Sequence, residues 1–495
     1  MMDKKSKRSI KKNSKNKIIR MKKAGITLAA IQLFITIIFI REVVLLNVLS
    51  IGIAVGIGVA LLGLEIVCFL MMEKYPKRRS FVFRIISIVL SIIMAVAVFY
   101  SWRTRNALSK VASNNVDITS VSAYVKKDDP ATSMEDAKGY EFGILQGMDR
   151  KNTDKAVKQA EEALGSKLKT HEYKSLTELA DGITTGKIKA LMINDGYLSL
   201  YSDLEGYEGF PKEIKKISQY KIKNVIKKTE SADITKPFVM YISGIDTYGK
   251  VGTVSRSDVN ILATVNPQSG QMLLINTPRD YYVPLSISKG VKDKLTHSGI
   301  YGIECSRDTL GMLYDEKVNH YFRLNFSGFQ GMIDALDGVD VESDVAFSSF
   351  GYDFKVGTNH LNGKQALAFA RERHAFASGD NQRGKNQMKV IDAVVRKVQS
   401  PSILKNYLGV LDNLNGTFET DLSYDQLTDL VKNQTKNGTK WNVSSYSVTG
   451  TGAKSSNTYS MPGQNVYVMN PDKDMVKKGA DLIDSVMSGK TPVIE

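Results

Sequence analysis

The stretch that decides the fold reads FVMYISGID (residues 238–246) and, after a glycine-containing loop, SRSDVNILATVN (residues 255–266). Both segments carry the short apolar runs that are typical of buried β-strands. Asp246 therefore ends one predicted strand, and Asp258 begins the next. Because glycines allow the intervening loop to fold back, we expect the two carboxylates to lie close together.

Strands and helices continue to alternate downstream. Met272–Ile275 predicts a further strand, and Phe326–Leu336, Lys364–Arg371 and Asp380–Val398 predict helices. This alternation favours an α/β domain over residues 232–495, with a central sheet flanked by helices on both faces.

A smaller α/β pattern precedes this domain. Residues 103–231 begin with a polar stretch, Asn106–Pro130, that is typical of a linker. Short predicted strands and helices then follow, over Tyr140–Gln146, Thr153–Leu164, His171–Tyr173, Ser175–Ile183 and Lys189–Asn194. We interpret residues 103–231 as a linker and an accessory domain, and no cluster of polar residues there marks a site.

Three long apolar runs occupy residues 24–102, at about 24–40, 43–72 and 85–102. Each approaches the roughly 20 residues that a helix needs to cross a bilayer. A cleavable signal peptide would have one such run, so the pattern indicates three transmembrane helices, separated first by a loop at Arg41 and Glu42.

The net charge of +16 is concentrated beside these runs. Residues 1–23 carry 11 Lys and Arg against one acid, and residues 73–84 carry five against one. By the positive-inside rule both blocks face the cytoplasm, and everything after Trp102 lies outside. The basic tail could also bind DNA electrostatically, although attraction to anionic lipid explains it more simply.

Composition excludes several other classes of protein. Apolar residues make up 43% of the 495 positions, which excludes a fully disordered chain. The two cysteines exclude a disulfide framework, and the five histidines show no metalloprotease spacing. There is no P-loop and no GxSxG elbow, so neither ATP-driven nor serine-based chemistry is indicated.

Arginines recur in blocks with acids, glycine or proline, at 255–258, 276–280, 369–374 and 380–387. Arginine suits bidentate recognition of phosphate oxygens. Two carboxylates fill only some of the coordination positions of Mg²⁺, so the ion would keep water ligands and also bind oxygens of a phosphate. Each block alone is weak evidence, because an arginine beside an aspartate is usually a surface ion pair.

In this order the blocks resemble the LytR-CpsA-Psr family of Gram-positive envelope proteins, most closely the capsule-locus CpsA type of streptococci. The resemblance covers nearly the whole chain. It is carried by the Gly-x-Asp and Arg-Ser-Asp pair and by four further blocks, namely Thr277–Asp280, Asp293–Leu295, Asn325–Phe329 and Leu361–Leu367.

The resemblance implies a membrane-anchored phosphotransferase that attaches capsular polysaccharide, or a similar glycopolymer, from a polyprenyl-pyrophosphate carrier to peptidoglycan. Asp246 and Asp258 would hold Mg²⁺ or Mn²⁺, and with Arg279 they form the expected catalytic set. The pyrophosphate would be bound by Arg256, Arg279, Lys294, Arg371, Arg373, Arg383 and Gln387. The polyprenyl chain would lie in an apolar cavity, and other capsule-assembly membrane proteins are further expected partners.

The sequence departs from the family pattern at Asn386, and two rival interpretations are open. The family usually has an arginine before the glutamine of the last helix, where this chain has Asn386, so one cationic contact is missing or comes from Lys385. One rival is a transcriptional regulator or attenuator of capsule biosynthesis that acts through the basic tail. A tail of 23 residues has no room for a helix-turn-helix. A non-catalytic scaffold for capsule assembly is a third class, which the intact acid pair and arginines disfavour.

Overall fold

The computed structural model describes residues 4–73, 78–112, 116–226, 232–245, 254–377, 379–400, 409 and 418–494. The chain forms two compact units. One unit contains Met1–Lys110 with Ser423–Gly438, and the other contains Val111–Leu422 with Thr439–Glu495.

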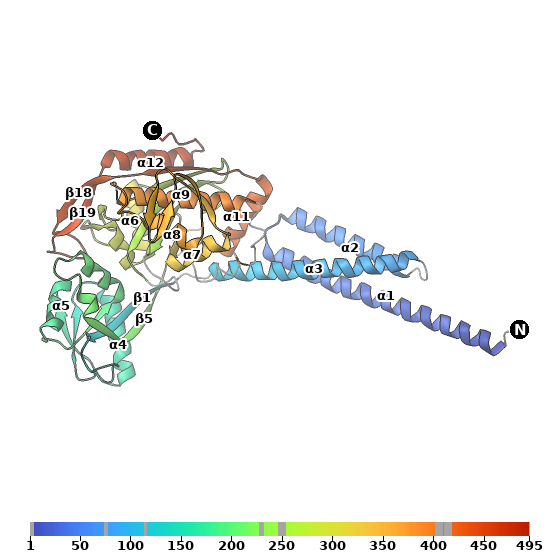
Figure 1. Cartoon of the computed structure of the whole chain (residues 1–495). Helices are drawn as coiled ribbons and strands as arrows, with labels where there is room; N and C mark the ends of the chain where they lie inside the picture. Colours follow the sequence, from blue (N-terminus) through green and yellow to red (C-terminus); the bar gives the residue numbers. More distant parts are fainter. Residues whose placement is uncertain are drawn as a thin grey trace. The chain divides into compact units, whose positions relative to one another are not determined.

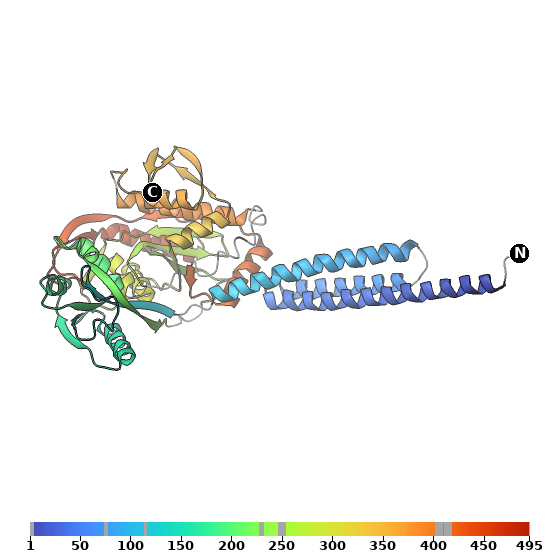
Figure 2. The same cartoon turned by 60° about the horizontal axis from the view of Figure 1, so that its bottom comes forward.

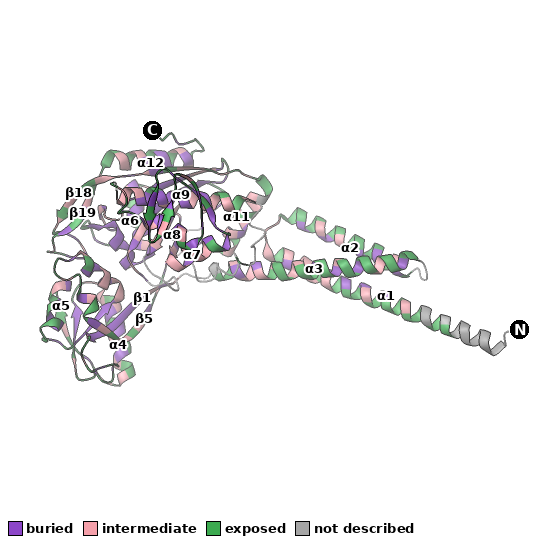
Figure 3. Cartoon of the chain, viewed as in Figure 1, coloured by how far each residue is buried: buried purple, intermediate pink, exposed green. Residues whose placement is uncertain are grey.

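The first unit is built on three long helices, α1 (Lys4–Leu46), α2 (Ile51–Glu73) and α3 (Arg78–Val111), which run alongside one another (Figure 1). Their apolar stretches of 28, 23 and 33 residues are long enough to cross a membrane. Many large apolar side chains on these helices are exposed, as expected for surfaces that face lipid (Figure 3). The prediction of three membrane-type helices is confirmed.

The first turn lies beyond the charged pair that was expected to form the loop. Helix α1 continues through Arg41 and Glu42, and the chain turns at Asn47, whose φ is 56°. The Glu42 carboxylate pairs with Arg41 (2.9 Å) and with Arg105 of α3 (3.2 Å). Because two guanidinium groups compensate this buried carboxylate, it can remain inside the helix. The prediction of a loop at Arg41 and Glu42 is therefore wrong.

The first unit also contains helix α11 (Tyr424–Asn437). The Tyr424 hydroxyl donates a hydrogen bond to the carbonyl of Leu46, at 2.9 Å. This contact ties α11 to the last residue of α1.

The accessory domain is a five-stranded sheet with strand order β3-β2-β4-β1-β5. Helices α4 and α5 pack on it, as the alternating pattern predicts. Its elements are β1 (Val116–Lys126), β2 (Glu141–Leu145), α4 (Arg150–Leu164), β3 (Lys169–Tyr173), α5 (Leu176–Thr184), β4 (Ala190–Asn194), the 3₁₀ helices η1 (Asp195–Asp203) and η2 (Phe210–Lys212), and β5 (Ile214–Val225).

Strand β1 occupies much of the segment that was predicted to be a linker. It pairs with β4 on one side and with β5 on the other. Its polar side chains Asp117, Thr119 and Ser122 are buried. The linker prediction is wrong for this segment, because small polar residues that are buried by tertiary contacts give no apolar alternation.

The larger sheet has six strands in the order β16-β11-β6-β7-β8-β17. Strands β6, β7 and β8 pair antiparallel, whereas β11 joins β6 and β17 joins β8 in parallel. The strands are β6 (Phe238–Ile245), β7 (Ser257–Asn266), β8 (Gln271–Asn276), β11 (His320–Asn325), β16 (Phe418–Thr420) and β17 (Asn442–Ser447).

Helices cover both faces of this sheet, as expected for an α/β/α domain (Figure 2). Helices α6 and α12 share a core with one face, in which Tyr241, Leu262 and Leu310 are buried. Helices α7, α8 and α9 line a pocket on the sheet together with β6 and β11. The helices are α6 (Ile303–Tyr314), α7 (Phe326–Ala335), α8 (Gly363–Arg371), α9 (Asp380–Gln399) and α12 (Lys473–Met487).

Short strand pairs complete the domain. β9 (Tyr282–Pro284) pairs with β10 (Lys292–Lys294), which leads into the 3₁₀ helix η3 (Leu295–Tyr301). The remaining pairs are β12 (Val339–Ser343) with β15 (Gly357–Leu361), β13 (Phe347–Ser349) with β14 (Tyr352–Phe354), and β18 (Gly450–Ser455) with β19 (Val466–Pro471).

A buried arginine joins the two sheets. Arg323 of β11 is 2% exposed in its side chain and donates to Glu419 of β16, with Nε to Oε2 at 2.9 Å. Its guanidinium also donates to Asp117 of β1. The other Asp117 oxygen accepts the backbone N–H of Ile303, at 3.1 Å. Burial raises the pKa of the Glu419 carboxyl, and the charge of Arg323 opposes that rise.

We expect Arg323→Leu to lower the free energy of unfolding by about 3–5 kcal/mol, because it leaves two carboxylates buried without a counter-charge. Urea unfolding of the full chain in detergent measures the loss. Arg396→Leu is the matched control, since Arg396 is 53% exposed in its side chain, pairs with Asp392 on its own helix and donates to the carbonyl of Asp340 at 3.3 Å. That substitution should cost under about 1 kcal/mol. Equal losses in the two variants would contradict the linking role of Arg323.

Candidate functional site

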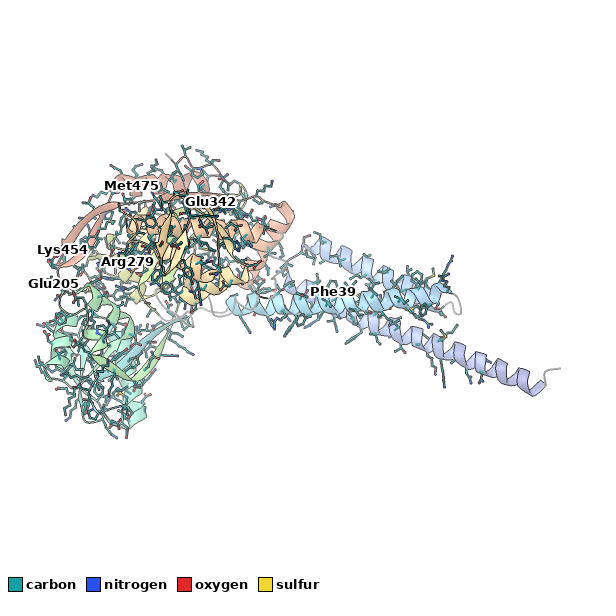
Figure 4. The ribbon with its side chains drawn as sticks, viewed as in Figure 1. Phe39, Glu205, Arg279, Glu342, Lys454 and Met475 are labelled. Carbon is teal, nitrogen blue, oxygen red and sulfur yellow. The ribbon has the colours of Figure 1, made fainter. Side chains whose placement is uncertain are left out.

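Most of the predicted site residues gather around the beginning of β7 and the beginning of α9. Arg279 lies between Asp258 and Asp280 and is labelled in Figure 4. The charges of Arg279, Arg256 and Arg383 all act on the Asp258 carboxyl. Asp246 falls outside the described residues, so its proximity to Asp258 stays a prediction.

Asp258 and Arg279 form the central ion pair of the site. Arg279 Nη1 lies 2.9 Å from Asp258 Oδ1, and the two side chains are 14% and 18% exposed. The Thr296 hydroxyl donates to the same oxygen at 3.0 Å. Burial raises the pKa of the Asp258 carboxyl, but the three arginine charges outweigh burial and hold that pKa below its usual range. Asp258 is therefore ionised at neutral pH.

Lys294 is buried and paired with two carboxylates. Its side chain is 4% exposed, and its ammonium lies 2.8 Å from Asp203 and 3.5 Å from Asp280. Asp280 also lies 3.7 Å from Arg279 Nε. Lys294 thus connects η1 of the accessory domain to the segment that carries Arg279.

His297 belongs to the same network of buried ion pairs as Lys294 and Asp203. Its Nδ1 lies 2.8 Å from Asp293, and its Nε2 lies 3.6 Å from Asp203. Burial lowers the pKa of the imidazole, but Asp293 and Asp203 outweigh burial and raise it above its ordinary value. Burial raises the pKa of the Asp203 carboxyl. The contacts with His297 and Lys294 outweigh burial and hold that pKa below its usual range.

Asp203, Asp280 and His297 were not predicted as site residues from the sequence. Asp280 and His297 lie within or beside the quoted motifs, so the signal for them was proximity to Arg279 and Lys294. Asp203 had no such signal, because it lies in the accessory domain. Arg256 reaches the same domain, where its Nη1 donates to the Ser202 hydroxyl at 3.4 Å.

Helix α9 brings Arg383 and Gln387 to the site. Arg383 pairs with Asp380 one turn earlier, and Gln387 Nε2 donates to the carbonyl of Ala370 at 3.3 Å. Burial raises the pKa of Asp380, and the charge of Arg383 opposes that rise. A Cβ at Gly384 would lie 2.0 Å from the Asn276 amide, so α9 can approach the sheet this closely only with glycine there.

Asn386, which stands where the family usually has an arginine, bonds to residues of α8 and α9. It is buried, and its amide donates to the carbonyl of Phe369 at 3.3 Å while accepting from Gln382 at 3.1 Å. Its role is to join α8 and α9. Lys385 is exposed on α9.

Arg371 and Arg373 come from the end of α8. The Arg371 guanidinium lies over two aromatic rings, 4.2 Å from the centre of Phe326 and 5.0 Å from that of Phe350. Arg373 is exposed, and its Nε donates to His374 at 3.2 Å. Its charge acts on Arg383, so it belongs to the same cluster.

An apolar pocket adjoins these charges. Its volume is about 990 Å³, which includes the solvent-filled space at its open side. Asp258, Arg371 and Gln387 contribute the ionisable and amide groups of its wall, together with Asn325. Helix α9 contributes Val390, Ile391, Val394 and Val395 to this pocket. The apolar wall comes from Ile242, Phe322, Leu324, Phe326, Phe329, Met332, Leu367, Val390, Ile391, Val394 and Val395, among others.

The described residues offer only part of a metal site. Within them, no group of three or more His, Cys, Asp or Glu side chains is placed to hold an ion. Asp258 supplies one ionised carboxylate, of which Oδ1 already accepts from Arg279 and Thr296. This donor set fits a hard cation that keeps waters and takes further oxygens from elsewhere, and it does not fit a closed protein cage.

Comparison with known proteins identifies the family. Residues 202–478 match the model of the LytR_cpsA_psr family. The chain is 37% identical over 195 residues to the polyisoprenyl-teichoic acid–peptidoglycan teichoic acid transferase TagU of Enterococcus faecalis, a match that covers 39% of this chain and 64% of that protein. It is 36% identical over 207 residues to TagU of Bacillus mycoides, covering 41% and 67%.

Among solved structures, that of Bacillus subtilis TagV aligns with a TM-score of 0.43 and 25% identity, over 52% of this chain and 99% of that one. The family model covers more than half of the chain and includes every residue of the charged cluster described above. The chain therefore belongs to the LytR-CpsA-Psr family.

Proposed function

We propose that this protein is a membrane-anchored phosphotransferase that moves a glycopolymer from a polyprenyl-pyrophosphate carrier to peptidoglycan. The observation that carries the proposal is the apolar pocket with Asp258, Arg371 and Gln387 in its wall. An apolar chain joined to a diphosphate needs this combination of an apolar cavity and cationic groups. Family membership and the names of the TagU relatives support the same reaction class.

The arginines differ in how they contribute to binding of the pyrophosphate. Arg371 and Arg373 have no carboxylate partner among the described residues, so their charges are available to the pyrophosphate. Arg279, Arg383 and Arg256 surround Asp258 and complete the cationic side of the site. Gln387 assists from the pocket wall. Lys294 contributes indirectly, because its ammonium contacts Asp280 and holds that carboxylate beside Arg279.

The reaction needs no nucleophilic side chain. A peptidoglycan hydroxyl attacks the phosphorus that is bonded to the glycan, and the bond from that phosphorus to the polyprenyl phosphate breaks. The hydroxyl proton passes to solvent water, and the products are polyprenyl phosphate and a phosphodiester-linked glycopolymer. Catalysis of this kind depends on positioning and on stabilising the negative charge. The arginines supply that charge stabilisation in this chain.

A divalent cation belongs to the proposal as well. Asp258, with Asp246, would hold Mg²⁺ or Mn²⁺, and the ion would neutralise phosphate oxygens when bound. Asp258 is ionised and can provide the carboxylate that such an ion requires.

The donor and the acceptor are proposed by chemical class. The TagU relatives are named for teichoic acid transfer to peptidoglycan. The capsule-type sequence resemblance favours capsular polysaccharide as the glycopolymer in this chain. Both are anionic or neutral glycans on the same kind of lipid carrier, so the pocket and the arginines serve either.

The proposed topology follows from charge. The 11 Lys and Arg of residues 1–23 keep the N-terminus in the cytoplasm of a Gram-positive cell, and three helices then place the second unit outside. Protease added to intact, wall-stripped cells should digest residues after about 112 and leave an N-terminal tag intact. Full protection of the C-terminal part would contradict this topology and the proposed function with it.

We expect Asp258→Ala to reduce transfer by at least about 100-fold, because it removes a metal ligand and frees Arg279 from its counter-charge. Asp246→Ala should do the same. Release of polyprenyl phosphate from a polyprenyl-pyrophosphate glycan, in the presence of peptidoglycan and Mg²⁺, measures the effect. Asp340→Ala is the matched control, since Asp340 is 65% exposed in its side chain, where its carboxylate pairs with His360. Wild-type activity in the Asp258 variant would remove the metal assignment.

The arginines and the basic tail distinguish an enzyme from a regulator. Arg371→Ala and Arg373→Ala should each slow glycan attachment by about 10- to 100-fold, because each removes a charge-assisted contact worth about 1.5–3 kcal/mol. Arg279→Ala should do at least as much. Deletion of Lys4–Lys17 should leave attachment unchanged, since Arg20, Lys22 and Lys23 still fix the orientation.

Wall-linked polysaccharide and capsule-gene transcript, measured in both sets of strains, decide the question. Normal attachment in the arginine variants, together with altered transcription after the tail deletion, would show that the enzyme assignment is wrong and that the protein is a regulator.

A further inference from the structure

Arg371 is held in a different way from the other arginines of the site. Arg279 pairs with Asp258, and Arg383 pairs with Asp380. Arg371 has no carboxylate within ion-pair distance in the part of the chain that the structure describes, and its guanidinium instead lies over the rings of Phe326 and Phe350. Two aromatic rings thus take the place that a carboxylate has beside Arg279 and Arg383.

This difference has a consequence for anion binding. A carboxylate orients an arginine but also neutralises it. The face of an aromatic ring attracts a guanidinium through its quadrupole and leaves the net charge in place. The five N–H donors of a guanidinium lie in its plane, so a ring against its face leaves the donor edge open. A guanidinium held by rings is therefore oriented and still fully able to bind a phosphate.

Phe350 occupies a backbone position that disfavours phenylalanine. It lies at the tip of the β13–β14 hairpin, where Ser349 pairs with Tyr352. The two loop residues, Phe350 and Gly351, have φ values of 48° and 81°. Positive φ at both positions is typical of a type I′ turn, which prefers Asn-Gly. A β-carbon and a bulky ring make this left-handed conformation costly for phenylalanine.

Burial does not explain the choice of residue. Phe350 is 66% exposed, whereas Phe347 and Phe354 of the same hairpin are buried and their ring centres lie 4.8 Å apart. The hairpin is anchored by the buried pair, and its tip could carry the asparagine that the turn prefers. The contact that phenylalanine adds at this position is the one with Arg371.

We propose that Phe350 is a positioning residue, which with Phe326 orients the Arg371 guanidinium for the pyrophosphate without neutralising it. The inference rests on the proposed function, because it takes Arg371 to be a phosphate contact. It adds that a residue at a strained hairpin tip, and not a carboxylate, orients the Arg371 guanidinium. Residues that are conformationally costly and confined to a functional site often serve such a purpose.

The test uses Phe350→Asn, which fits the turn better and removes the ring. The full chain in detergent is titrated with a long-chain polyprenyl pyrophosphate, and its thermal unfolding is recorded. We expect binding to weaken by about 3- to 30-fold, the range of a cation–π contact, while the unfolding temperature stays equal or rises. Phe350→Trp, which keeps a ring face, should bind within about twofold of wild type.

Two controls isolate the contact. In an Arg371→Ala background, Phe350→Asn should cause no further loss, because the partner of the ring is absent. Val356→Asn removes another apolar side chain, 63% exposed, beside the same hairpin and should leave binding unchanged. Equal loss in the Val356 and Phe350 variants would mean that the hairpin acts by contacting lipid or detergent, and would overturn the proposal.

The remaining outcomes are also decisive. If Arg371→Ala weakens binding but Phe350→Asn does not, or if the two losses simply add, Phe350 has no positioning role although the proposed function stands. If Phe350→Asn lowers the unfolding temperature, the residue is structural and the inference is wrong. If the wild-type protein neither binds the pyrophosphate nor transfers glycan, the proposed function fails, and the inference fails with it.

Discussion

The Arg323 guanidinium is the group on which the arrangement of the second unit depends. It binds Glu419 of β16 and Asp117 of β1, residues that lie 96 and 206 positions away from it in the chain. Asp117 in turn accepts the backbone N–H of Ile303, the first residue of α6, which follows η3 after Gly302. Because η3 carries Thr296 and His297, this buried charge cluster connects the accessory sheet to the residues around Asp258. A buried charge with all its partners in place tolerates little displacement, since each lost partner leaves an unpaired ion.

The candidate site also depends on how its charges are paired, because its arginines are held in different ways. Arg279 and Arg383 are paired with carboxylates, so they contribute position and a modest residual charge. Arg371 rests on aromatic rings and keeps its whole charge beside an apolar pocket. The accessory domain takes part directly, because Asp203 neutralises Lys294 and contacts His297. The accessory domain therefore contributes Asp203 to the charged cluster of the candidate site.

Much of the architecture could be read from local patterns. The apolar runs predicted the membrane-type helices, and alternating strands and helices predicted both α/β parts. Local patterns failed where tertiary contacts compensate a polar group. Asp117 and Ser122 made β1 look like a linker, and Glu42 made a helix look like a loop. In each case the compensating partner lies far away in the sequence, where no local pattern can report it.

By itself, the sequence determined which residues carry charge at the ends of the strands and helices, since glycine, proline and apolar periodicity act over a few neighbouring positions. It thus identified Asp258, Arg279, Arg371 and Arg383 as one candidate group. Only the tertiary structure decided how each is used, because electrostatic partners are set by proximity in space. It buried Lys294 between Asp203 and Asp280 and placed Arg371 over Phe350. Whether a charge remains available to a ligand depends on those neighbours.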